Sequence, residues 1–135
     1  MQSEQHEVRI LLLDYLTSIS RKDFKRKLRL DYSEKQCDIL LERLDSFASQ
    51  CQQNSILLSF PYVWDKVREL TPSLTKDEVA ELLWNKGYQK QGVSKKQLGN
   101  ICFSWFVFEK QFLEFRKEKL QEKIQNNKHN NELEL

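Results

Sequence analysis

Few residues of the chain have the type and spacing that enzyme chemistry needs. A zinc site needs cysteine, histidine or carboxylate ligands at short spacing, whereas the cysteines and histidines here are widely scattered: Cys37, Cys51, Cys102, His6 and His129. A Cys–His nucleophile pair would have to use a histidine near one end of the chain. The three glycines, Gly87, Gly92 and Gly99, fit no phosphate-binding loop. We therefore expect no catalysis, no metal and no cofactor.

The composition describes one ordinary domain. The chain has 135 residues, 39% of them apolar and 31% charged, a length that can bury about two-thirds of the unfolded surface. It contains no run of about 18 uncharged apolar residues, so we expect no membrane segment, and the first residues do not read as a signal peptide. An odd number of cysteines then points to reduced thiols. These features predict a cytoplasmic protein.

The charge balance argues against a polyanion as the main partner. The chain has 22 basic and 20 acidic residues, a formal charge of +2, and both signs are interleaved. The segment 21–29 is a local exception, because its six basic residues face a single acid. Two interpretations stay open for this segment: a solvated helix face, or a docking patch for an acidic partner built from Arg21, Lys22, Lys25, Arg26 and Arg29.

Apolar residues recur at steps of three and four along most of the chain, which predicts an all-α fold. We expect helices near 5–16, 20–30, 33–48, 61–70, 75–84 and 94–124, with a short extended piece at 56–60. Three of these helices open with a capping box: Ser33 with Gln36, Thr75 with Glu78, and Ser94 with Gln97. Residues 1–125 are expected to form a single helical domain, followed by a flexible polar tail at 126–135.

The last expected helix is unusually rich in aromatic residues. Six of the fifteen aromatics of the chain fall between residues 103 and 115, and residues 101–108 are apolar nearly all the way round. Such a helix is buried either in its own domain or against a partner. For the partner contact we predict the face formed by steps of three, four and three: Trp105, Phe108, Phe112 and Phe115.

Three equally spaced segments share one pattern, in which a β-branched residue stands shortly before a helix: Ile19-Ser-Arg-Lys-Asp-Phe24, Ile56-Leu-Leu-Ser-Phe-Pro61 and Val93-Ser-Lys-Lys-Gln-Leu98. Together with the capped helices between them, they resemble the EF-hand superfamily over roughly residues 8–105. The resemblance implies helix–loop–helix units whose loops pair through a minimal antiparallel bridge. Ile56 and Val93 are expected to form that two-residue bridge.

The loops implied by this resemblance are degenerate. Calcium needs six to eight oxygen ligands, but Phe60 and Gln97 stand where a bidentate acid belongs, and Lys86 and Lys90 would repel a cation. The resemblance therefore implies a calcium-independent structural or adaptor protein that grips an amphipathic helix of a partner protein. Related proteins of this kind suggest a cytoskeletal, axonemal or myosin-associated subunit. An unrelated all-helical domain stays open as the alternative fold.

The alternative function is nucleic-acid binding by a helix-turn-helix over residues 75–103. The start of its second helix has the residue types that contact phosphates and base edges: Ser94, Lys95, Lys96, Gln97 and Asn100. However, the expected connection of about eight residues is longer than the usual three or four. The rest of the chain also adds no net positive field, so we prefer the protein-binding adaptor.

Overall fold

The computed structural model describes the backbone of residues 4–134 and the side chains of residues 4–53 and 55–123. This part of the chain contains no strand, so the all-α prediction is confirmed. Its elements are α1 (Glu4–Thr17), α2 (Arg21–Arg29), α3 (Glu34–Gln50), α4 (Asn54–Leu70), α5 (Lys76–Leu83), the π-helical stretch η1 (Trp84–Tyr88) and α6 (Lys95–Glu134).

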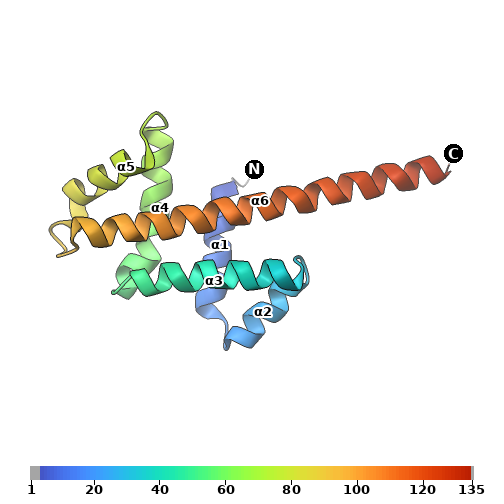
Figure 1. The fold of residues 1–135 in the computed structure, drawn as a ribbon, viewed down its shortest axis with the longest axis horizontal. Helices are drawn as coiled ribbons and strands as arrows, with labels where there is room; N and C mark the ends of the chain where they lie inside the picture. Colours follow the sequence, from blue (N-terminus) through green and yellow to red (C-terminus); the bar gives the residue numbers. More distant parts are fainter. Residues whose placement is uncertain (1–3, 135) are drawn as a thin grey trace.

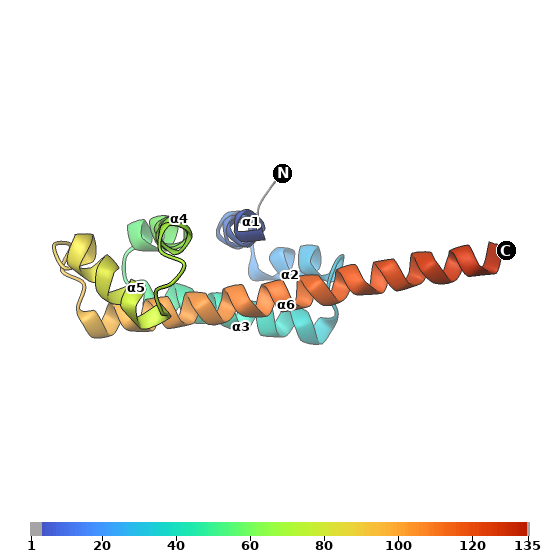
Figure 2. The same cartoon turned by 90° about the horizontal axis from the view of Figure 1, so that it is seen from above.

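The long helix α6 organises the fold. In Figure 1, α3 lies alongside α6 and runs in the opposite direction, while α1 and α4 cross this pair. Figure 2 shows that α1 and α4 lie on the same side of the α3–α6 layer. The short helices α2 and α5 pack near the beginnings of α3 and α6. The second half of α6 extends beyond the rest of the molecule in both views.

Local capping explains where several helices begin. Both hydrogen bonds of the box are present at Ser33–Gln36 and at Thr75–Glu78, so these two predictions are confirmed. At the start of α6, the Gln97 amide donates to the Ser94 hydroxyl at 3.0 Å, which is one of the two bonds of the predicted box. Each bond satisfies a backbone N–H group that has no partner within the helix.

The predicted bridge between Ile56 and Val93 is wrong, because Ile56 lies in the first turn of α4. The segment expected to be extended is helical and turns its apolar side chains into the core, where Ile56 and Phe60 are 1% and 0% exposed. Val93 follows a turn at Gly92, whose φ of 83° favours glycine. The Val93 amide donates to the Tyr88 carbonyl at 3.1 Å rather than to another loop.

The connections between helices are also shorter than the EF-hand resemblance implies. Only residues 18–20 separate α1 from α2, and only residues 51–53 separate α3 from α4. Residues 45–50 and 54–60, which would form most of the second loop, are helical. The structure therefore contains neither of these two calcium-type loops.

The aromatic face predicted to contact a partner is instead the centre of the core. Trp105 and Phe108 are 0% exposed, and Phe112 and Phe115 are 6% and 8% exposed. The Trp105 ring lies 4.9 Å from the Phe47 ring of α3, measured between centroids. The face is buried because α3 packs along α6 and covers its largest side chains. The partner-contact prediction for this face is therefore wrong.

The segment predicted as a flexible polar tail includes the end of α6. The backbone of residues 126–134 continues α6 as a helix through Glu134, and residue 135 lies outside the described residues.

Among the described residues, no helix combines the length and the apolar character needed to cross a membrane.

Candidate functional site

The basic segment in α2 is largely neutralised within the molecule. Four of its five candidate cations pair with acids of the same chain: Arg21 with Asp45, Lys25 with Glu34 and Asp38, Arg26 with Asp23, and Arg29 with Glu34. Hydrogen bonds from Arg29 and Lys25 lower the pKa of Glu34 to about 2. Lys22 is exposed and has no ion pair in the described part of the chain. These pairs leave little uncompensated charge for an acidic partner.

A helix-turn-helix would present the start of α6 to DNA. Some side chains of this segment are instead in contact with other parts of the same molecule. Lys95 pairs with Glu81 at 3.1 Å, and its ammonium group lies 4.7 Å from the centre of the Trp84 ring. The Trp84 indole N–H in turn donates to the Val93 carbonyl at 2.8 Å. Ser94 caps the helix. The residues between α5 and α6 include η1 and a further turn, so this connection is longer than a helix-turn-helix uses.

A second face of α6, opposite the buried one, is only partly covered by the fold. It follows steps of three, four, three, four and three residues, and we call these six residues the outer face of α6: Phe103, Phe106, Lys110, Leu113, Lys117 and Leu120. Phe103 is 55% and Leu120 is 44% exposed, while Phe106 and Leu113 are half-buried. The outer face therefore exposes apolar side chains at the two ends of a span of about five turns of helix.

This spacing is the heptad pattern by which one helix packs along another. Part of the outer face is hollowed into a groove of about 540 Å³, formed by Lys110, Leu113, Lys117 and Leu120 with neighbouring residues that include Glu4 at the start of α1. The sequence continues the pattern with Ile124 and Asn127. The heptad steps were thus readable from the sequence, but the aromatic density of residues 101–108 drew the prediction to the other face.

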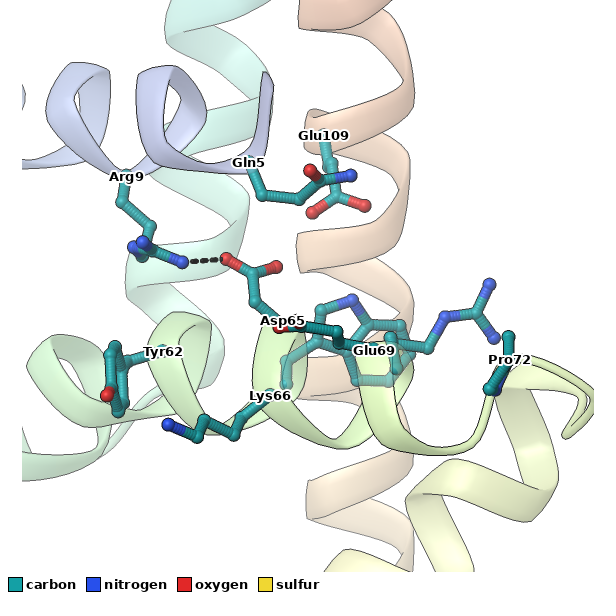
Figure 3. A pocket seen from close by; sticks show the side chains of 10 residues that line it. Gln5, Arg9, Tyr62, Asp65, Lys66, Glu69, Pro72 and Glu109 are labelled. Atoms are coloured by element: carbon teal, nitrogen blue, oxygen red, sulfur yellow. Dashed lines mark hydrogen bonds and ion pairs between the residues drawn. The ribbon is translucent and has the colours of Figure 1, made fainter. Parts of the chain in front are cut away.

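A separate polar cleft of about 610 Å³ lies between α1, α4 and α6. Figure 3 shows Arg9 of α1 reaching Asp65 of α4, with Glu109 of α6 on the other side of the Asp65 carboxyl group. The Arg9 guanidinium donates a hydrogen bond to Asp65 and lies 5.5 Å from the centre of the Tyr62 ring. Side chains from three helices therefore meet in this cleft.

The carboxyl groups of Asp65 and Glu109 form a buried acidic pair. Burial raises the pKa of Glu109 to about 7, and the negative charge of Asp65 acts in the same direction. Burial also raises the pKa of Asp65, although Arg9 opposes that change. Glu109 Oε2 is buried and receives no hydrogen bond, so a proton on this carboxyl group lets it donate to Asp65. The pair can thus hold one proton near neutral pH.

The cysteine thiols do not form a catalytic site, and the described residues do not form a metal site. Burial raises the pKa of both Cys51 and Cys102 to about 12, so these thiols stay protonated and are poor nucleophiles. Cys37 is buried as well, and burial raises its pKa. Within the described residues, no three or more histidine, cysteine, aspartate or glutamate side chains come together as a metal site would require.

Comparison of the chain with family models, with curated protein sequences and with solved structures finds no match. The candidate sites therefore rest on the geometry of this chain alone: a partly exposed heptad face along α6, and a carboxyl pair inside the cleft between α1, α4 and α6.

Proposed function

We propose that this protein is a calcium-independent adaptor or structural protein that binds a helix of a partner protein along the outer face of α6. A single observation carries the proposal. The apolar residues of the outer face recur at heptad spacing, and Phe103 and Leu120 at its two ends stay exposed, although the opposite face of the same helix is packed in the core. Exposed apolar surface with such a pattern is typical of a docking site for another helix.

Covering the exposed apolar side chains of the outer face would contribute free energy to the binding of a partner. Fully covering a phenylalanine or leucine side chain contributes about 1.5–3 kcal/mol. Phe103 and Leu120 are each about half exposed, so covering them contributes about 1 kcal/mol each. The half-buried Phe106 and Leu113 and the groove beside Leu113 add to this contact. Because α3 holds the other face of α6, the outer face is presented on a supported helix.

The proposal includes no catalytic role, and it places the protein in the cytoplasm as part of a larger, for example cytoskeletal, assembly. The protonated state of the buried thiols supports the absence of cysteine catalysis. All three cysteines are free rather than disulfide-bonded, which supports a reducing compartment. A cell-fractionation experiment with the tagged full chain tests the location.

The binding role is tested with the double variant Phe103→Ser/Leu120→Ser. The full chain and the variant are used as baits in affinity capture from the native source, with quantitative mass spectrometry. Since both side chains are exposed, we expect the fold to persist and the specific partner to be lost. The matched control is Leu30→Ser/Leu70→Ser, which removes two leucines that are 83% and 75% exposed elsewhere.

Circular dichroism and thermal unfolding of all three proteins accompany the capture. A partner that binds the control variant and the unchanged chain but not the Phe103/Leu120 variant supports the proposal, and it is then confirmed with the purified partner. A partner retained by a folded Phe103/Leu120 variant contradicts it. Equal loss of the partner in both variants would also contradict it, because the outer face would then have no special role.

A further inference from the structure

The outer face of α6 combines its apolar residues with lysines that form no ion pair within the described residues. Lys110 and Lys117 occupy two of its six positions, and both are exposed. Neither takes part in any ion pair within the described residues, unlike four of the five cations of α2. Lys76 of α5 adds a third positive charge at one end, with its ammonium group 4.8 Å from the centre of the Phe103 ring. Two acids line the groove beside these lysines: Glu114, and Glu4, which pairs with Arg116 at 3.7 Å.

When a partner covers the outer face, the ammonium groups of Lys110 and Lys117 lie in a contact from which water is partly removed. Burying a charge is costly unless a group of opposite charge accompanies it. A partner with only apolar residues would cover Phe103 and Leu120 but leave Lys110 and Lys117 without compensation. The partner must therefore supply acidic side chains at these two positions.

The same charges argue against a second copy of this chain as the occupant. Two outer faces packed together would enclose four lysines, two from each copy, against the two Glu114 carboxylates, because Glu4 already pairs with Arg116. Like charges brought together across a helix contact are destabilising. Nucleic acid fits less well than a protein, because phosphates can pair with the lysines but leave the intervening apolar residues uncovered.

We infer that the partner is an acidic amphipathic helix, with apolar residues at heptad spacing and a carboxylate facing each of Lys110 and Lys117. Phe103 and Leu120 lie about 26 Å apart along α6, so the partner helix needs about 18 residues or more to cover the outer face. Its apolar side chains pack on Phe103, Phe106, Leu113 and Leu120, one of them in the groove beside Leu113. This inference rests on the proposed function and adds the charge of the partner to it.

The test uses the full chain and two synthetic helical peptides of about 25 residues. Both carry leucines facing the apolar positions of the outer face. One has glutamate and the other lysine at the positions that face Lys110 and Lys117. By fluorescence anisotropy we expect the glutamate peptide to bind about tenfold more tightly or better, and the difference to shrink as salt rises from about 50 mM to about 500 mM.

Charge reversal gives the decisive comparison. In Lys110→Glu/Lys117→Glu we expect the preference to switch to the lysine peptide. The matched control Lys86→Glu/Lys90→Glu changes two exposed lysines elsewhere and should keep the preference for the glutamate peptide. Because all four positions are at the surface, circular dichroism should show an unchanged helix content in both variants.

Several outcomes overturn the inference. Equal binding of both peptides, with loss in Phe103→Ser/Leu120→Ser, shows that the outer face binds helices without the charge preference. Binding of neither peptide, while capture from the source still depends on Phe103 and Leu120, also overturns it and leaves the proposed function standing. Displacement of the glutamate peptide by a short DNA duplex overturns it in favour of a polyanion ligand. A change of preference in the Lys86/Lys90 control shows a general field effect and overturns it too.

Discussion

Replacing Glu109 with glutamine should remove a pH dependence of stability that originates in the acidic pair with Asp65. In the folded protein the pKa of Glu109 is about 7, against an ordinary value of 4.5. Below pH 4.5 both the folded and the unfolded chain carry this proton, and its stabilising effect is fully present. Between pH 4.5 and 7 only the folded chain keeps it, so stability falls as the pH rises. Above pH 7 the effect is lost.

The size of the effect follows from the two pKa values. Each pKa unit corresponds to about 1.4 kcal/mol, so the gap between 4.5 and about 7 amounts to about 3 kcal/mol. Solvent reaches the half-buried Glu109 side chain and screens part of it, so we expect about 2 kcal/mol. In Glu109→Gln the amide can still donate to Asp65, but it carries no charge at any pH. The variant should match the unchanged chain near pH 5 and exceed its stability by about 2 kcal/mol near pH 8.

Urea unfolding followed by circular dichroism, at intervals from pH 5 to pH 8.5, measures this difference directly. The matched control is Glu114→Gln, which changes an exposed carboxylate on the same helix and should leave the slope of stability against pH unchanged. Parallel pH profiles for the unchanged chain and Glu109→Gln would refute the reasoning. A larger stability of the unchanged chain at pH 8 would refute it as well, because the ionised pair would then be favourable.

Three further perturbations test other parts of the structure. Phe108→Ala should lower the free energy of unfolding by about 3–5 kcal/mol and Phe103→Ala by less than about 1 kcal/mol; similar values in urea unfolding would show that the two faces of α6 are not assigned correctly. Arg9→Met should cost about 2–3 kcal/mol, because it leaves the Asp65 carboxylate, whose side chain is 10% exposed, without its ion-pair partner, and Asp65→Asn added to it should recover part of the loss in the same assay. Thermal unfolding with about 1 mM calcium or with a chelator should give coinciding curves; an increase of several degrees with calcium would contradict the degenerate-loop interpretation of the sequence.

Much of the secondary structure could be predicted because its signals are local. The boxes at Ser33 and Thr75 mark helix starts through hydrogen bonds within one turn. The apolar period likewise located α2, α3 and α5 near their observed positions. The prediction failed at Ile56 and Phe60, where a continuous apolar run before Pro61 suggested an extended piece. A short apolar run fits a strand or a buried helix equally well, and only the core that receives both side chains decides between them.

For the candidate sites, too, some features can be seen in the sequence and others depend on how the helices pack. The heptad steps from Phe103 to Leu120 are a property of the sequence, and so is the apolar character of residues 101–108. Whether Trp105 or Phe103 is covered is not, because both faces of α6 are apolar and the choice depends on where α3 docks. The sequence also gives no sign that Asp65 and Glu109 meet. The pKa of Glu109 is raised because the packing of α1 and α4 against α6 removes water from two carboxyl groups that lie far apart in the chain.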